Sequence, residues 1–520
     1  MFARFARRSV LLLLALLSLA PLSRAAVLRV TKAGSATPDG QTWATAYGSV
    51  QAAVNAGANG DEVWVAAGKY VENITLKDGV SLYGGFAGTE TARSQRDWTA
   101  NESILDGNGA GRVVTGSAIG SSTTLDGFTY QNGPKYIDSV TYGGGMYVIG
   151  SATISNNIFR ANSATLGGGL AVTGSPTIRN NVMSGNRAFS AGGVYVDGGE
   201  AGGALIEGNT ITGNRADSSG GGGYFINCVI RNNAFTGNIG YYSAIGGATV
   251  QASILTGNVI SANTGLAVWG ESSLIERNWI ESNTGGFGTT GALNLSNSTA
   301  RSNVILRNSS VGGCAVGLSD GCTLTNNTIT ANTCSFPLFE GQYSDGVIAI
   351  RSGTLVPPTI SNNVIVGNDC GINAPGTARY RNNLVSGNLY FNYYTTGSWH
   401  QNDISGTPTF VNAAADDYRL TIDSVGIDAG YDAPLTADAL DFAGNPRRQG
   451  EHSDLGAYEY AAVADVAMTP THGTFLPPLD IALSCPTPDA PIHYTLNGAA
   501  PTASDPVVPA SGKITLNAWA

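Results

Sequence analysis

The chain has 520 residues, of which 70 are glycine and only 12% are charged, and its formal net charge is −10. This acidic balance disfavours nucleic acid as a partner and repels acidic polysaccharides at long range. Abundant glycine with little charge is typical of a turn-rich β protein rather than a helical one.

The first 25 residues have the features of a secretory signal peptide. Arg4, Arg7 and Arg8 form a basic start, residues 10–20 an apolar core, and residues 23–25 a small-residue cleavage motif. The apolar core is too short to span a bilayer, so a transmembrane anchor is the less favoured alternative. No later segment is apolar for long enough to cross a membrane. We therefore expect an exported protein, secreted or at the cell surface, with no transmembrane segment in the mature chain.

Residues 26–106 combine a short amphipathic helix with short strands. The stretch TWATAYGSVQAAVNA has one apolar helical face, and DEVWVAAGKYVENITLKDGVSLYGGF reads as strands broken at glycines. Trp43 and Trp64 fit buried positions here better than exposed sugar platforms. We interpret this part as the cap and first turns of a repetitive β structure, whose open end would otherwise expose its core and unpaired strand edges.

Residues 107–409 carry an asparagine-marked repeat with a period of ~24 residues. One example is TISNNIFRAN, and every copy contains two asparagines five positions apart. The first of the two, the reference asparagine, stands at Asn157, Asn181, Asn209, Asn233, Asn258, Asn278, Asn303, Asn327, Asn363 and Asn383. The second stands at Asn162, Asn186, Asn214, Asn238, Asn263, Asn283, Asn308, Asn332, Asn368 and Asn388.

Large apolar residues recur three positions before and two positions after the reference asparagine, as at Ile154 and Phe159. They alternate with polar neighbours, which predicts short strands on either side of a turn, and glycine-led segments such as GGGMYV suggest a third strand. Like strands stacked in parallel make a β-helix. The asparagine suits a left-handed turn, and amides stacked ~4.8 Å apart can bond along a column as a ladder.

The repeat resembles the right-handed parallel β-helix of the pectin-lyase-like superfamily. Its phrases IFRANSATLGGGL, MSGNRAFSAGGV and FTGNIG also resemble the repeats of polymorphic outer-membrane proteins. The resemblance implies an all-β chain, with a right-handed parallel β-helix solenoid and a short N-terminal cap helix. Because this fold supports lyases, hydrolases, adhesins and stalks, it does not by itself imply an activity.

The pattern changes after residue 409. Residues 410–460, with FVNAAADDYRL, GIDAG, DFAGNPRR and DLGAYEY, resemble the closing region of exported β-helix proteins of the choice-of-anchor class. Residues 461–468 fit a linker. Residues 469–520, with IHYTLNG and ITLNA, resemble the small β-sandwich module appended to chitobiases and other glycoside hydrolases. The sequence stops where a last strand of that module is expected, which is consistent with a truncated module.

A column of alternating charge lies two positions before the reference asparagines. We interpret it as ion pairs between neighbouring repeats rather than as a catalytic cluster. Its members are Arg179, Glu207, Arg231, Glu276 and Arg301.

The six cysteines match no zinc motif. Cys334 and Cys370 each follow, by two positions, the second asparagine of consecutive repeats. Equivalent positions in neighbouring turns of a β-helix lie ~5 Å apart, within reach of a disulfide. The pair is either a disulfide or two stacked buried thiols, and the sequence leaves both open.

Candidate binding residues lie where the period breaks. The insertion SFPLFEGQYSDG interrupts the repeats between Asn327 and Asn363, and NLYFNYYTTGSWHQND follows the last repeat. Loops carry function in such folds and exposed aromatic rings stack on sugars. The alternative for the second segment is a cap on the end of the core. The predicted sugar-contacting residues are Phe339, Tyr343, Tyr390, Tyr393, Tyr394 and Trp399.

Three functions from different classes remain. A lyase or hydrolase needs carboxylates clustered with a calcium ion and a basic residue, or a carboxylate pair, yet Asp197, Asp217 and Asp320 occupy different columns and the four histidines lie outside the repeats. We favour a non-catalytic protein that binds a polysaccharide or cell-surface glycan as a monomer. The alternatives are a polysaccharide lyase or glycoside hydrolase, and a structural surface stalk. No cofactor, metal site or catalytic residue is predicted.

Overall fold

The computed structural model describes residues 25–134, 142–200, 202–241, 245–335, 346–351, 355–373, 378–394, 399–433, 435–460, 466–471, 477–485, 491–497, 499–502, 504–509 and 511–516, without the side chains of Phe287, Ser335 and Trp399. The predicted signal peptide lies outside these residues except for Ala25. The chain forms two compact units, Met1–Glu459 and Tyr460–Ala520. No helix in the described part is both long and apolar enough to span a membrane.

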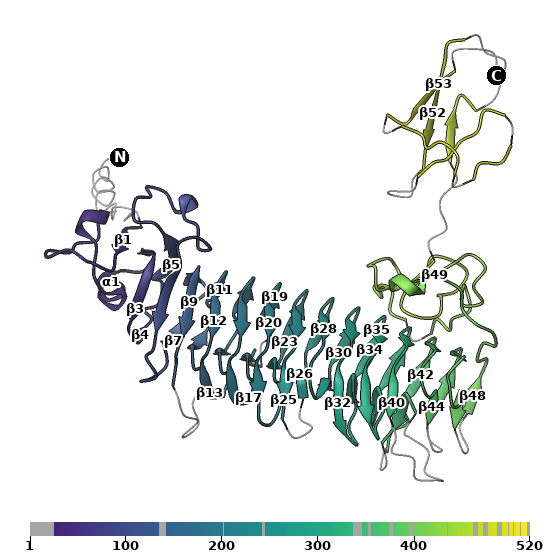
Figure 1. Ribbon diagram of the computed structural model, residues 1–520, viewed down its shortest axis with the longest axis horizontal. Coiled ribbons are helices and arrows are strands. Elements are labelled where there is room, and N and C mark those ends of the chain that lie inside the picture. Colours follow the sequence, from purple (N-terminus) through teal and green to yellow (C-terminus); the bar gives the residue numbers. More distant parts are fainter. Residues whose placement is uncertain are drawn as a thin grey trace, which may run out of the picture. The chain divides into compact units, whose positions relative to one another are not determined.

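The first unit is a parallel β-helix, in which each turn of the chain, or rung, adds one strand to each of three parallel sheets (Figure 1). In the described residues sheet A has 15 strands and sheets B and C have 13 each. The predicted all-β solenoid is confirmed.

Sheet A contains β1 (Val27–Val30), β2 (Glu62–Ala66), β5 (Ser81–Phe86), β8 (Thr124–Asp126), β11 (Thr153–Ser155), β15 (Thr177–Arg179), β19 (Ala204–Glu207), β23 (Cys228–Arg231), β27 (Ile254–Thr256), β30 (Leu274–Glu276), β34 (Thr299–Arg301), β38 (Thr323–Thr325), β42 (Thr359–Ser361), β45 (Arg379–Arg381) and β48 (Trp399–Gln401). Sheet B contains β3 (Gly68–Val71), β6 (Ser103–Asp106), β9 (Phe128–Gln131), β12 (Ile158–Arg160), β16 (Val182–Ser184), β20 (Thr210–Thr212), β24 (Ala234–Thr236), β28 (Val259–Ser261), β31 (Trp279–Glu281), β35 (Val304–Leu306), β39 (Thr328–Thr330), β43 (Val364–Val366) and β46 (Leu384–Ser386).

Sheet C contains β4 (Ile74–Thr75), β7 (Val114–Ile119), β10 (Met146–Gly150), β14 (Leu170–Thr173), β18 (Val194–Asp197), β22 (Gly223–Ile226), β26 (Ile245–Gln251), β29 (Leu266–Glu271), β33 (Leu293–Ser296), β37 (Val316–Leu318), β41 (Ile348–Ile350), β44 (Ile372–Asn373) and β47 (Tyr393–Tyr394). Two short sheets form between sheets B and C. They contain β13 (Ser163–Leu166), β17 (Arg187–Ser190), β21 (Arg215–Ala216) and β25 (Ile239–Gly240), and then β32 (Thr284–Phe287), β36 (Ser309–Val311) and β40 (Thr333–Ser335).

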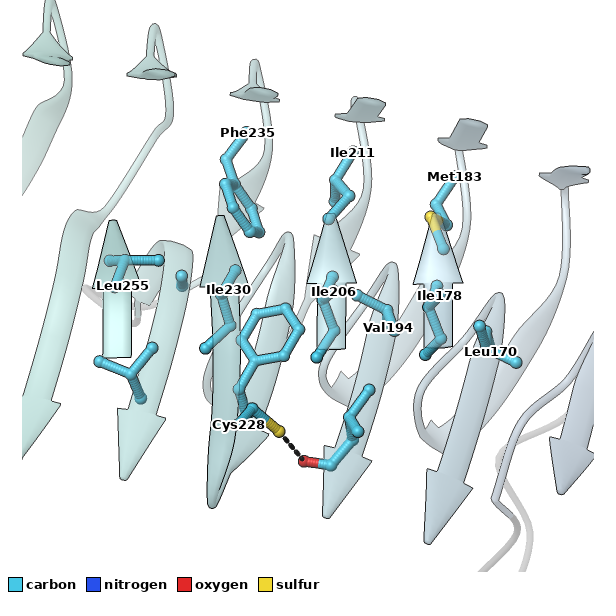
Figure 2. Packing of buried hydrophobic residues seen from close by; sticks show 14 of the residues in the cluster. Leu170, Ile178, Met183, Val194, Ile206, Ile211, Cys228, Ile230, Phe235 and Leu255 are labelled. Carbon is cyan, nitrogen blue, oxygen red and sulfur yellow. Dashed lines mark hydrogen bonds between the residues drawn. The ribbon is translucent and has the colours of Figure 1, made fainter. Parts of the chain in front are cut away.

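The core is a stack of apolar columns, one from each sheet. Figure 2 shows Ile178, Ile206 and Ile230 in line along sheet A, facing Met183 and its neighbours from sheet B. These side chains have no exposed surface. The period-two alternation predicted from the sequence is therefore confirmed, because the middle residue of each three-residue strand in sheets A and B points inward while its two neighbours point outward.

Both asparagine columns form ladders inside the turns. Asn233, for example, accepts hydrogen bonds from the backbone N–H and Nδ2 of Asn209 at 2.8 and 2.9 Å, and its own Nδ2 donates to Ile206 O and to Asn258 Oδ1 at 3.0 Å each. The second column repeats the pattern, as from Asn214 to Asn238.

One part of the asparagine prediction is wrong. The left-handed residue is the one before each ladder asparagine, such as Asn156 (φ 56°) and Asn232 (φ 56°), and not the ladder asparagine itself. The physical reason is that the two residues have different roles. The left-handed residue bends the chain and faces outward, so the side chain of the next residue points inward and forms hydrogen bonds along the column.

The N-terminal cap is built around the helix α1 (Val50–Ala56), which buries Val50, Ala53 and Val54. Glu72 binds the start of this helix, accepting from the backbone N–H groups of Val50 and Gln51 at 3.0 Å each. Two 3₁₀ helices, η1 (Trp43–Thr45) and η2 (Arg93–Gln95), flank it in the chain. Trp64 is 4% exposed and stacks on Phe86, so it is a packing residue as predicted.

The last rung and the closing region differ from expectation. Strand β48 adds a final rung that includes His400, with Asp403 in the place of the reference asparagine, so the prediction that all four histidines lie outside the repeats is wrong. Aspartate can replace asparagine there because, in the described residues, no further rung follows that needs the Nδ2 donor.

Residues 410–459 contain β49 (Phe410–Asn412), η3 (Ala413–Ala415) and the antiparallel β50 (Asp417–Leu420), and they cover the outer face of sheet B over its last strands (Figure 1). The second unit contains one antiparallel sheet among its described residues, with β51 (Ala467–Thr469), β52 (Leu479–Ser484) and β53 (Lys513–Leu516). The chitobiase-type sandwich stays a prediction.

Candidate functional site

An aromatic column runs along the outer face of sheet C. The strand register places Tyr147 opposite Ala171, which is opposite Tyr195, and Tyr195 opposite Tyr224. The column continues from Tyr224 to Thr249 on the next strand and to Trp269 on the strand after that. These positions point outward because their chain neighbours on both sides face the core. We name Tyr142, Tyr147, Tyr195, Tyr224 and Trp269 the aromatic strip.

Tyr142 closes the gap that Ala171 leaves in the column. Its ring stacks on Tyr147 with centroids 5.2 Å apart and lies 6.0 Å from the ring of Tyr195. Tyr195 in turn meets Tyr224 edge to face at 5.8 Å. All five rings of the strip are half-buried. Four tyrosines thus form one continuous aromatic surface, and Trp269 lies two strands beyond them.

The next outward column of sheet C, beside the strip, passes through Asp197, Ile226, Gln251 and Glu271, of which all but Ile226 carry hydrogen-bonding groups. Tyr224 donates its hydroxyl to Gln251 Oε1 at 2.7 Å, and Gln251 Nε2 donates to Glu271 Oε2 at 2.7 Å. Burial raises the pKa of Tyr195 to about 12, with the charge of Asp197 adding to it, and burial and Glu271 raise the pKa of Tyr224. Both phenols are therefore neutral hydrogen-bonding groups over the whole physiological range.

The sequence carries a signal for this strip. The segments GGGMYV, GGVYV and GGGYF place Tyr147, Tyr195 and Tyr224 at equivalent positions after glycines. Tyrosines repeated at an outward strand position predict a row of aromatic rings on the surface of the solenoid. Thr249 and Trp269 follow less regular segments, so only the strand register assigns them to the column.

The residues predicted to contact sugar separate into three groups. Tyr394 continues the column of the aromatic strip, opposite Asn373, and is 46% exposed, while Tyr390 is 69% exposed in the loop before it. Tyr393 points the other way and packs against the core. The side chain of Trp399 and all of Phe339 and Tyr343 lie outside the described residues.

Tyr393 belongs to a polar cap at the end of the core. Its hydroxyl donates to Asp403 Oδ2 at 2.7 Å, and His400 Nδ1 lies 3.0 Å from the same oxygen. The His400 ring stacks on Tyr380 at 4.8 Å and meets Tyr393 edge to face at 4.7 Å. This cluster closes the last rung, so Tyr393 fits the capping alternative and not a sugar platform.

Cys334 and Cys370 lie on consecutive rungs, as the repeat predicted. The second asparagines before them bond in the ladder, with Asn332 Nδ2 donating to Asn368 Oδ1 at 3.0 Å. Both cysteines are buried, and Cys334 is a free thiol in this structure. Burial raises the pKa of Cys334, and the neighbouring Cys314 and Cys370 raise it further. The disulfide therefore stays a prediction beside the alternative of stacked thiols.

The charged column on sheet A forms ion pairs between rungs, as predicted. Arg231 pairs with Glu207 at 2.8 Å and Arg301 with Glu276 at 2.7 Å. The acids considered for catalysis have separate local roles. Asp217 pairs with Arg187 at 2.9 Å, and Asp320 accepts the backbone N–H of Val356 at 3.0 Å. In the part of the chain that the structure describes, no three His, Cys, Asp or Glu side chains gather to hold a metal ion.

Comparison with known proteins establishes the family. The profile described as "right handed beta helix region" matches residues 113–284 and 192–407. No curated protein matches the chain. Pectate lyase Pel9A is 15% identical over 85% of this chain and 98% of its own, with a TM-score of 0.36. XylC in complex with xylose is 10% identical over 84% and 98%, with a TM-score of 0.44.

The A-module of mannuronan C-5 epimerase AlgE6 from Azotobacter vinelandii is 17% identical over 68% of this chain and 94% of its own, with a TM-score of 0.38. Likenesses of this degree say nothing about activity. The anchor class and the polymorphic outer-membrane-protein repeats stay predictions. Because the profile covers more than half of the residues, the chain belongs to the right-handed β-helix family.

Proposed function

We propose that this is an exported protein, secreted or held at the cell surface, that binds a glycan on the aromatic strip without cleaving it. The observation that carries the proposal is the continuous run of tyrosine rings beside a column that contains the hydrogen-bonding side chains of Asp197, Gln251 and Glu271. Aromatic faces take the apolar faces of sugar rings, and these side chains offer acceptors and donors to the hydroxyl groups. Export rests on the signal-peptide features of residues 1–25.

The strip favours a polymer over a single sugar. It runs along the solenoid axis from β10 to β29, across six strands, and therefore extends over ~24 Å. One ring contributes on the order of 1 kcal/mol, so a single sugar binds weakly, whereas one chain that meets several rings binds appreciably. Asp197 and Glu271 lie beside the strip and the net charge is −10, which favours a neutral polymer over a uronic-acid polymer.

The carboxylates beside the strip are too far apart to cleave a glycosidic bond as a pair. Asp197 on β18 and Glu271 on β29 are three strands apart, which is ~14 Å along the solenoid. A glycosidase pair lies ~5–10 Å apart. Asp197 also accepts the backbone N–H of Gly199, and Glu271 accepts from Gln251. This spacing supports the binding function over the hydrolase alternative at this site.

The test is retention of the protein on insoluble neutral polysaccharides. Replacing Tyr195, Tyr224 and Trp269 together by leucine keeps apolar bulk but removes three rings, so we expect affinity to fall by roughly two orders of magnitude. The matched control is Phe189→Leu with Tyr241→Leu, two aromatic residues that are 52% and 41% exposed outside the strip.

The same experiment separates the alternatives. Unchanged retention of the triple variant, with unfolding behaviour like that of the parent protein, would overturn the assignment of the site. A double variant, Tyr390→Ala with Tyr394→Ala, asks whether the end of the column adds affinity. Release of reducing or unsaturated sugars by the parent protein would replace the binding function with a hydrolase or a lyase. Absence of any retention would leave the stalk alternative.

A further inference from the structure

A second, independent feature lies on another face of the solenoid. Residues 87–102 form a loop over the outer side of sheet A, between β5 and β6. Glu90, only 8% exposed, fixes the start of this loop, because its carboxylate accepts the backbone N–H groups of Ala87, Gly88 and Thr89 at 2.6, 3.0 and 2.9 Å. Glu90 O also accepts Trp43 Nε1 at 2.9 Å. The loop is therefore held in a defined conformation against the outer side of the solenoid.

Two glycines with positive φ let the loop lie against the strands. A Cβ on Gly85 (φ 91°) would lie 2.6 Å from Trp98 Cα, and a Cβ on Gly127 (φ 82°) would lie 2.7 Å from Arg96 Nη1. The first contact would require the loop backbone to move, and the second would require the Arg96 side chain to move. Arg96 and Trp98 are therefore held against the backbone of sheet A at defined positions.

The loop and β2 border a pocket that is open to solvent, with a volume of about 520 Å³, lined by Glu62, Arg93, Ser94, Arg96 and Trp98. This volume lies within the range of small-ligand sites. The Trp98 ring is 38% exposed, and the guanidinium of Arg96 lies 4.9 Å from its centroid.

Residues of sheet A and its turns hold the two arginines of the pocket in place. The Arg96 side chain, 9% exposed, is ion-paired with Asp126 and donates to Gly84 O at 2.9 Å. Arg93 lies over the ring of Tyr83 at 4.4 Å and pairs with Glu62 at 2.5 Å.

The charges in and behind the pocket balance. Each guanidinium has its own carboxylate, Arg93 with Glu62 and Arg96 with Asp126, so the site offers no net charge to a ligand. It offers a partly exposed indole face, a serine hydroxyl, the Arg93 guanidinium and the remaining lone pairs of the Glu62 carboxylate, which already accepts from Arg93 and, at 2.7 Å, from Trp64 Nε1. Those groups match a sugar ring, whose apolar face stacks on an aromatic side chain while its adjacent hydroxyls donate to a carboxylate and accept from a guanidinium.

We propose that this pocket is a second carbohydrate site, which takes a neutral mono- or disaccharide, such as the end or a side branch of a glycan. It differs from the aromatic strip in form and place. The strip is an open column on sheet C that suits a polymer, whereas the pocket is a local hollow at the N-terminal end of sheet A. The proposal does not depend on the strip, because none of the pocket residues belongs to it.

The test measures the binding of small sugars to the full chain by saturation-transfer NMR and calorimetric titration. The panel contains neutral monosaccharides and disaccharides, with glucuronic and galacturonic acid as its anionic members. We expect binding of at least one neutral sugar with millimolar affinity. Trp98→Leu should weaken that binding at least tenfold, because the stacking face is lost. Ser94→Trp should abolish it by filling the pocket, since Ser94 is exposed and a larger side chain there need not disturb the solenoid.

The matched control is Phe189→Leu, an exposed ring outside both the pocket and the strip, which should leave the titration unchanged. Trp269→Leu, on the strip, reports any binding of small sugars there. Weakening by Trp269→Leu but not by Ser94→Trp would overturn the proposal in favour of small-sugar binding on the strip. Binding of the uronic acids alone would overturn the charge argument, and binding of no sugar in the panel would overturn the site. A binding loss in Ser94→Trp together with a parent-like thermal unfolding curve confirms that the pocket itself, and not the fold, was changed.

Discussion

Two adjacent asparagines, one directly before the reference asparagine and the reference asparagine itself, have different structural roles. Asn232 turns the chain in the left-handed region and is exposed, while Asn233 is 2% exposed and bonds along the column. In the last rungs the asparagine directly before the reference asparagine also binds the closing region. Asn326 and Asn362 donate their side-chain amides to the carbonyls of Asp454 and Tyr431, both at 2.9 Å, and so hold the closing region.

Asn233→Leu should lower the free energy of unfolding by about 2–4 kcal/mol. The substitution removes the acceptor of the backbone N–H of Asn209 and leaves that buried donor unsatisfied, and it also leaves Ile206 O without its side-chain donor. Asn232→Gly is the matched control, because glycine adopts the left-handed region at no steric cost, and it should change the stability by less than ~1 kcal/mol. Chemical denaturation measures both, and equal stabilities would contradict the ladder argument.

The stacked cysteines lead to a second prediction at this scale. The backbone N–H of Asp369 donates to Asn332 O at 3.1 Å, which sets Cys334 and Cys370 on neighbouring rungs. In protein exported to an oxidising compartment we expect a Cys334–Cys370 linked peptide after digestion without reductant. Mass spectrometry decides the question. Two free thiols would support the alternative of stacked buried thiols.

At the scale of elements, the closing region explains a change in the outer face of sheet B. Where residues 410–459 cover it, outward positions such as Val304, Leu306 and Leu384 are fully buried. In earlier rungs the equivalent Val182 and Val259 are 36% and 44% exposed. The sequence pattern is similarly apolar at both, so the fold-back of a distant segment decides which positions become core.

The closing region is locked by the buried pair of Arg447 and Glu459, whose side chains are 2% and 1% exposed and 2.9 Å apart. Arg447 also donates to the carbonyls of Asp454, Gly456 and Ala457. Arg447→Met leaves a buried carboxylate without its partner, and we expect a loss of about 3–5 kcal/mol. Hydrogen exchange at Val304 and Leu306 should accelerate as the closing region opens.

The control for this prediction is Arg419→Met. Arg419 pairs with Asp417 at 2.6 Å, but its side chain is 60% exposed, so the loss should stay below ~1 kcal/mol. The double variant Arg447→Met with Glu459→Leu should recover part of the stability, because it removes both buried charges. Full destabilisation of the double variant would show that the carbonyl contacts of Arg447, and not the ion pair, hold the region.

At the scale of the whole molecule, the two compact units predict independent unfolding. A chain that ends at Glu459 should retain the thermal transition of the solenoid and its retention on polysaccharide, since the strip and the core lie within the first unit. Calorimetry of the full chain should then show a separate transition that the shortened chain lacks. A large shift in the solenoid transition would instead reveal coupling between the units.

The sequence by itself determined the solenoid, its rung register and the asparagine ladders. It could do so because every rung reuses the same inward positions, so the periodic placement of Ile, Phe and Asn encodes the stacking directly. Only the tertiary structure decided which outward residues form sites. Tyr142 completes the strip from a loop, Arg96 and Trp98 reach the pocket through a loop over sheet A, and Tyr393 turns inward to Asp403. The physical reason is that these neighbours come from different rungs and from irregular loops, whose mutual placement depends on packing and not on any local pattern.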